Sequence, residues 1–211
     1  MIKIISKNAF ALGAVAAVCV AVLAIVNVKT APEIAEQRLA NKLATLAEVL
    51  PEGSVTPDLI HDCVLVQNEA LLGIDKPQAL YRLRQDGELK AYIIETTAPD
   101  GYSGNIELLV AVTPSAEILG SRVLNHQETP GLGDKIEARR SNWIFGFSGK
   151  TVTEANANQW AVKKDGGDFD QFTGATITPR AVVNAVRSAV LFISSQPELA
   201  TQPANCDSTR S

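Results

Sequence analysis

The feature of this sequence that most limits its fold is an apolar run near the start, from Ala9 to Val28. Only two of these 20 residues fall outside the apolar set, and none is charged. As a helix rising about 1.5 Å per residue, the run is about 30 Å long, which matches the hydrocarbon core of a bilayer. We therefore expect a single transmembrane helix over residues 9–28, after a short cytoplasmic segment over residues 1–8.

The charges around this run predict its orientation. Lys3 and Lys7 precede it, and basic residues favour the cytoplasmic side. The rest of the chain then lies in the periplasm, anchored to a bacterial inner membrane. The alternative is a cleaved signal peptide, for which Val22 and Ala24 offer a cleavage site, although the run exceeds the usual apolar length of about 7–15 residues. Both alternatives export the remainder of the chain.

Charge and metal-ligand composition exclude two classes of function. The full chain has a net charge of −4, and residues 1–29 contain three lysines and no acidic residue. The remaining part is therefore strongly acidic and has no run of Lys or Arg, which argues against nucleic-acid binding. Two histidines and three cysteines, with no C-x-x-C or H-x-x-x-H pair, give no zinc or iron–sulfur pattern.

Two of the three cysteines, Cys63 and Cys206, lie outside the apolar run. The compartment outside the membrane is oxidising, so we expect a disulfide between them that ties the C-terminal tail to the start of the domain. The alternative is two free thiols.

The rest of the chain divides by pattern into a helix, a domain and a tail. Apolar residues at helical spacing predict an amphipathic stalk helix over residues 29–50, which Pro51 and Gly53 terminate. A periplasmic domain follows over residues 51–195. Residues 196–211 are polar, and we expect them to form a loosely held C-terminal tail.

Within the domain, alternating apolar residues predict mainly strands. One hairpin is expected around Asp86-Gly87 and a second around Pro114-Ser115. The expected strands cover 63–66, 80–84, 90–97, 106–112, 117–124 and 160–163, and the expected helices cover 134–147 and 179–194. This mixture predicts an α+β fold with a mainly antiparallel sheet and packed helices.

The most informative stretch for chemistry is the loop before the last helix, residues 170–179. Thr178 suits the N-cap position, and Pro179 suits the first helical position. Gly174 and Ala175 leave the backbone accessible, and exposed amides at a helix start favour an anion such as phosphate. From the residues alone, an ordinary capped helix after a glycine turn is the favoured explanation.

The stretch Asp170-x-x-Thr173-Gly174-Ala175-Thr176 resembles the flavinylation motif of FMN-binding domains. Such domains occur in Rnf/Rsx and Na+-translocating NADH:quinone reductase complexes. The resemblance implies that a flavin transferase joins FMN, through its phosphate, to the hydroxyl of Thr176. It gives Thr178 a role as a cap or phosphate donor, while Asp170 is read by the transferase or only shapes the loop.

Two further segments resemble the same family and stand in its order. They are Gly101-Tyr102-Ser103-Gly104 and Glu128-Thr129-Pro130-Gly131-Leu132-Gly133. Within the family the G subunits of Rnf/Rsx complexes are most similar, and the C subunit of the quinone reductase is the alternative.

These segments suggest how a flavin could be held. Glycines such as Gly101 and Gly131 let backbone amides approach a flat ring. Tyr102, Thr129 and Leu132 are expected to line its pocket, unless both loops are plain surface turns.

Two basic or titratable groups near the motif stay open. Lys163 is expected to offset phosphate charge, although Lys163 and Lys164 together are equally well explained as a solvated pair. His126 is either a general base or a surface histidine, and Glu128 has no assigned role.

The resemblance implies an electron-transfer subunit of a multisubunit complex, with no catalytic residue of its own. The complex would couple electron transfer between ferredoxin and NAD to ion movement, or reduce a redox sensor. The expected partners are the other subunits and the flavin transferase. The alternatives are a cofactor-free anchored adaptor and, far less favoured, an exported hydrolase using Thr176, for which no Gly-x-Ser-x-Gly element exists.

Overall fold

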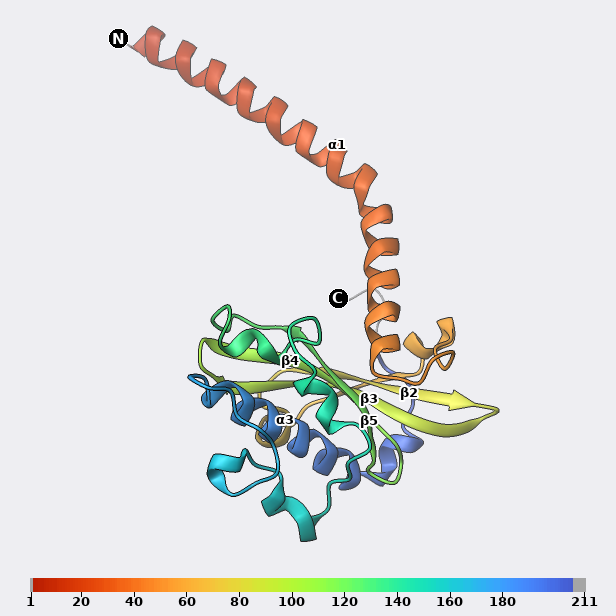
Figure 1. The fold of residues 1–211 in the computed structure, drawn as a ribbon. Coiled ribbons are helices and arrows are strands. Elements are labelled where there is room, and N and C mark those ends of the chain that lie inside the picture. Colours follow the sequence, from red (N-terminus) through yellow and green to blue (C-terminus); the bar gives the residue numbers. More distant parts are fainter. Residues whose placement is uncertain (1, 207–211) are drawn as a thin grey trace. The chain divides into compact units, whose positions relative to one another are not determined.

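The computed structural model describes residues 2–206 and divides the chain into two compact units, Met1–Ala44 and Thr45–Ser211. Helix α1 (Ile2–Glu48) runs without interruption through both predicted helices, so the expected stalk is a continuation of the same helix (Figure 1). Within the described part of the chain, no helix combines the length and apolar character needed to cross a membrane.

The second unit is built on a five-stranded sheet in which every neighbouring pair is antiparallel, so the α+β prediction is confirmed. The strands follow chain order and are β1 (Cys63–Val66), β2 (Gln78–Gln85), β3 (Glu88–Gly101), β4 (Gly104–Val112) and β5 (Ile118–Asn125). Asp86 and Gly87 both have positive φ, of 52° and 79°, as a tight hairpin turn requires.

Helix α3 (Ile177–Ser194) crosses one face of this sheet (Figure 1). Its valines, including Val182 and Val186, are fully buried with strand residues such as Ile94 and Leu108. This face and α3 form the main apolar core. The packing of α3 on the sheet determines where the N-terminal end of the helix lies.

The opposite face of the sheet is covered by the last turn of α1 and the segment that follows it, residues 45–60. Leu46, Val49 and Leu59 of this segment are buried, the last in the short 3-10 helix η1 (Pro57–Ile60). Gly120 of β5 lies so close that an added Cβ would sit 2.8 Å from the carbonyl oxygen of Val49. The centre of the sheet is therefore buried on both sides.

Two predicted elements are wrong. Residues 134–147 form no α-helix but two 3-10 turns, η2 (Gly133–Ile136) and η3 (Trp143–Phe147), because Trp143 and Phe147 turn inward into an aromatic cluster. Residues 160–163 form no strand, and Val162 makes only a single bridge to Phe169. The remaining short helices are α2 (Glu69–Leu72), η4 (Glu154–Gln159), η5 (Lys163–Asp165) and η6 (Pro197–Ala200).

The C-terminal segment is not loose up to its last described residue. Cys63 and Cys206 form a disulfide, as expected, with their Cα atoms 5.4 Å apart. Arg82, only 4% exposed, donates hydrogen bonds to the carbonyls of Leu199 and Gln202 and pairs with Asp62. The expectation of a loosely held tail is therefore wrong for this part, because its main-chain carbonyls are partners of a buried arginine.

Candidate functional site

The N-terminal end of α3 differs from the prediction in its capping residue. Thr176 is the N-cap, and Thr178 and Pro179 lie inside the first turn. Pro179 is tolerated there because the first-turn N–H groups have no partner within the helix. The prediction of Thr178 as the cap is wrong because its hydroxyl is used elsewhere in the fold. The hydroxyl of Thr176 makes no capping hydrogen bond.

The loop before Thr176 is a tight turn. The Ala175 N–H donates to the Phe172 carbonyl at 3.1 Å, and Gly174 has φ of 81°, a conformation that favours glycine. Thr173 and Gly174 lie exposed at the tip of this turn. The motif therefore presents its small residues to solvent.

Aromatic residues fix this loop from beneath. The Trp143 indole N–H donates to the carbonyl of Asp170 at 2.8 Å, and its ring meets that of Phe172 edge-on, with the centroids 5.2 Å apart. Phe172 is itself buried. These contacts hold the buried side of the motif in place and so limit the movement of its exposed turn.

The three motif hydroxyls have different surroundings. Thr178 is 1% exposed and donates to the carboxylate of Glu128. Thr173 is exposed at the turn tip, whereas Thr176 is half-buried and stands at the start of an 18-residue helix. A free hydroxyl at the positive end of a helix is suited to carry a phosphate.

Glu128 joins the two glycine loops to this helix. Its Oε1 accepts a hydrogen bond from the Ser103 N–H at 2.9 Å, and its Oε2 accepts one from Thr178. The three segments that the sequence singled out therefore converge on one buried carboxylate. Sequence reasoning left Glu128 without a role and did not single out Ser103.

The second glycine loop reaches the motif directly. The N–H groups of Leu132 and Gly133 both donate to the Thr129 carbonyl at 3.1 Å, and Gly131 has φ of 80°. A Cβ added to Gly174 would lie 3.7 Å from Cδ2 of Leu132. Leu132 and the turn of the motif are therefore neighbours.

Exposed apolar side chains come from all three converging segments. Tyr102, Leu132 and Ile177 are each more than two-fifths exposed. Large apolar groups left in solvent near a helix start are what a flat aromatic cofactor with a phosphate would use. The exposed side chains and the helix start therefore fit a cofactor of the FMN type.

Lys163 has a partner other than the one expected. Its ammonium group lies 2.6 Å from the Asp170 carboxylate, so it pairs with the aspartate of the motif. The backbone N–H of Lys164 donates to the side chain of Gln171. Both contacts brace the loop.

Arg180, which the sequence analysis did not single out, lies one helical turn after Thr176. Residues four apart share a helix face, and this spacing was the available signal. Its guanidinium makes two hydrogen bonds to Asp165, at 2.5 and 2.9 Å, which lowers the pKa of that carboxyl. Arg180 is the basic residue of α3 that is closest in sequence to Thr176 on the same helix face.

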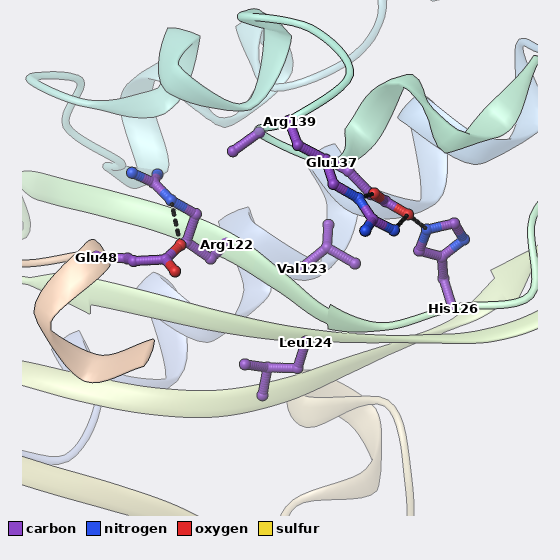
Figure 2. A pocket seen from close by; sticks show the side chains of 8 residues that line it. Glu48, Arg122, Val123, Leu124, His126, Glu137 and Arg139 are labelled. Atoms are coloured by element: carbon purple, nitrogen blue, oxygen red, sulfur yellow. Dashed lines mark hydrogen bonds and ion pairs between the residues drawn. The ribbon is translucent and has the colours of Figure 1, made fainter. Parts of the chain in front are cut away.

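His126 belongs to a chain of hydrogen bonds beside the site. Its Nδ1 accepts from the Glu128 N–H at 3.0 Å, so in the neutral ring Nε2 carries the proton and donates to Glu137 at 2.7 Å. Arg139 also binds Glu137, and mainly for this reason the pKa of Glu137 falls to about 2. Figure 2 shows that His126, Glu137 and Arg139 line a hollow, whose volume is about 370 Å³. Both ring nitrogens are therefore occupied, which favours a structural role for His126.

Family profiles and known relatives both match this chain. The profile described as FMN-binding domain matches residues 101–191, which include all three converging segments, and the profile described as RnfG N-terminal region matches residues 1–49. A Shewanella loihica protein, named as the G subunit of an ion-translocating oxidoreductase complex, is 48% identical over 98% of both chains. Proteins of the same name from Pseudoalteromonas atlantica (48%; 97% of this chain, 95% of that one) and Haemophilus influenzae strain PittEE (46%; 95% and 98%) are similar.

Proposed function

Because the chain belongs to the family of G subunits of ion-translocating oxidoreductase complexes, we propose that it carries electrons within such a complex through FMN attached to Thr176. The observation that carries the covalent part is the place of Thr176 at the N-cap of α3, where its hydroxyl makes no capping hydrogen bond. Its neighbour Thr178 is buried and already bonded, which leaves Thr176 as the better placed acceptor.

The phosphate would sit where charge favours it. A phosphoester on Thr176 lies at the positive end of α3, and the first turn of that helix contains no acidic residue. Arg180 is one turn away on the same face and would add a positive charge, in place of the expected Lys163.

The flavin ring would lie against Tyr102, Leu132 and Ile177, with the glycine loops allowing close backbone approach. The bound FMN supplies the electron-accepting chemistry, and the protein supplies orientation and electrostatic surroundings. This role requires no nucleophile or acid–base pair from the chain itself.

We propose that α1 anchors the protein in the bacterial inner membrane, with residues 9–28 crossing it once and the domain in the periplasm. The support is the uncharged run in the sequence, the lysines before it, and the exposure of apolar side chains such as Leu12 and Leu23. The disulfide between Cys63 and Cys206 suits an oxidising compartment. Partners would be the other subunits and a flavin transferase.

The experiment is in-gel flavin fluorescence after SDS denaturation, paired with intact mass. The full chain is purified from cells that export it and contain the transferase, with a second flavinylated protein as positive control. A fluorescent band whose mass is raised by one FMN phosphoester supports the proposal. A dark band at the unmodified mass, with the control labelled, would favour the cofactor-free adaptor.

A further inference from the structure

We propose that Glu128 is a positioning residue of the flavin site, which holds the Gly101–Gly104 loop against the first turn of α3 and places a negative charge beside the ring. The inference rests on the proposed function for the ring, but the clamp itself concerns only groups of this chain.

The carboxylate is buried and bonded at both oxygens. Glu128 is 5% exposed, Oε1 accepts from the Ser103 N–H, and Oε2 accepts from the Thr178 hydroxyl. An acceptor role at both oxygens fits an ionised carboxylate. A buried charge is costly unless it is hydrogen-bonded, so these two donors explain how it is tolerated.

Glycine backbone encloses the carboxylate on both sides. A Cβ added to Gly101 would lie 3.0 Å from Oε1 of Glu128 and 2.2 Å from the carbonyl oxygen of Gly104. One added to Gly133 would lie 2.9 Å from Oε2 and 2.8 Å from the hydroxyl oxygen of Thr178. The two loops can therefore close on Glu128 only because both positions lack a side chain.

The backbone of Glu128 is held from the other direction. Its N–H donates to His126, which in turn binds Glu137, the partner of Arg139 (Figure 2). The carboxylate is thus anchored at its own main chain while its two oxygens reach two different loops. Such double anchoring is what holds binding groups within a fraction of an ångström.

Two consequences follow for the flavin site. Loss of the carboxylate leaves the Ser103 N–H and the Thr178 hydroxyl without their partner, and frees the loop that carries Tyr102. Loss of the charge alone should make the ring easier to reduce, because a nearby negative charge opposes the addition of an electron. Geometry and charge can therefore be separated by substitution.

The test uses three full-length variants made in cells that contain the transferase. Glu128→Ala removes both the charge and the hydrogen bonds to Ser103 and Thr178. Glu128→Gln removes the charge but can still accept from Ser103 and donate to Thr178. Thr178→Val removes one donor and keeps the carboxylate. The measurements are amide hydrogen exchange at Ser103 and its neighbours, the flavin midpoint potential, and the mass of covalently bound flavin.

We expect exchange at Ser103 to rise at least about tenfold in Glu128→Ala and to stay near wild type in Glu128→Gln and Thr178→Val. The midpoint potential should become more positive in Glu128→Gln. Unchanged exchange at Ser103 in Glu128→Ala overturns the clamp. If that variant does not fold, an unchanged potential in Glu128→Gln overturns the proposal.

Failure of the proposed function gives a different result. A wild-type chain without flavin, from cells that label the control protein, would contradict covalent FMN at Thr176. The exchange comparison on the flavin-free chain would still decide whether Glu128 holds the loop.

Discussion

The hydroxyl of Thr178 donates a hydrogen bond to the carboxylate of Glu128, which lies 50 residues earlier in the chain. Two residues before Thr178, the hydroxyl of Thr176 makes no capping bond. One turn of helix therefore contains a hydroxyl that is locked into the fold and another that remains available. Under the proposed function, this difference would favour Thr176 over Thr178 as the acceptor of the flavin phosphate.

The turn of the motif depends on Gly174. Its φ of 81° is unfavourable for residues with a Cβ, although an added Cβ would meet only Leu132, at 3.7 Å. We expect Gly174→Ala to lower the free energy of unfolding by about 1–2 kcal/mol through backbone strain and to reduce flavin loading. Chemical denaturation and intact mass check this. Gly146→Ala, at a glycine without positive φ and with open space around it, is the matched control. Equal loading and stability in the two variants would contradict the strain argument.

The disulfide should make a large contribution to stability. The bond between Cys63 and Cys206 joins residues 143 apart in sequence, and closing so long a loop restricts the unfolded chain. Cys63→Ser with Cys206→Ser should lower the free energy of unfolding by about 2–5 kcal/mol, measured by urea titration. Cys19→Ser, at the free cysteine of α1, should have no effect on the domain. A double variant as stable as wild type would argue against the bond.

The buried arginine of β2 gives a second stability prediction. In Asp62→Ala, Arg82 loses its ionic partner while its guanidinium stays buried with only carbonyl oxygens. Such an uncompensated charge costs about 3–5 kcal/mol. Glu88→Ala disrupts the exposed pair with Lys90 and should cost much less, because solvent screens that pair. Thermal unfolding of both variants tests this, and similar losses in the two would refute it.

Acid should weaken the link at Glu137. Its pKa in the folded protein is about 2, below the usual value of about 4.3, so it stabilises the fold above pH 4.3 and this contribution disappears as the pH falls towards 2. Arg139 is largely exposed, so solvent screening keeps this contribution small.

The matched variant is Glu137→Gln. The difference in unfolding free energy between wild type and Glu137→Gln should be constant at pH 5–7 and shrink between pH 4 and 2. A difference that stays constant down to pH 2 would show that the pKa of Glu137 is not lowered.

Local patterns predicted most of the fold. Alternation around Asp86-Gly87 located the first hairpin, because that turn chemistry and side-chain period are properties of neighbouring residues. The helix expected over 134–147 failed because the packing of Trp143 and Phe147 overrides the helical period there. Thr178 and Pro179 have the sequence pattern of a helix start, and only the distant Glu128 explains why the helix begins earlier.

The sequence indicated the three segments of the candidate site but not the carboxylate of Glu128 that connects them. Glu128 joins Ser103, which is 25 residues away, to Thr178, which is 50 residues away. No spacing rule connects such positions in one sequence. The one available signal was a carboxylate directly before a glycine-rich loop, which did not reveal its partners.

The most direct measurement is peptide mass spectrometry that locates the flavin in wild type, Thr176→Ala and Thr173→Ala, each purified from cells with the transferase. We expect one FMN on the peptide that contains Thr176, none in Thr176→Ala and normal loading in Thr173→Ala, with unchanged circular dichroism throughout. Flavin that resists denaturation in Thr176→Ala would contradict the assignment of Thr176 as the acceptor.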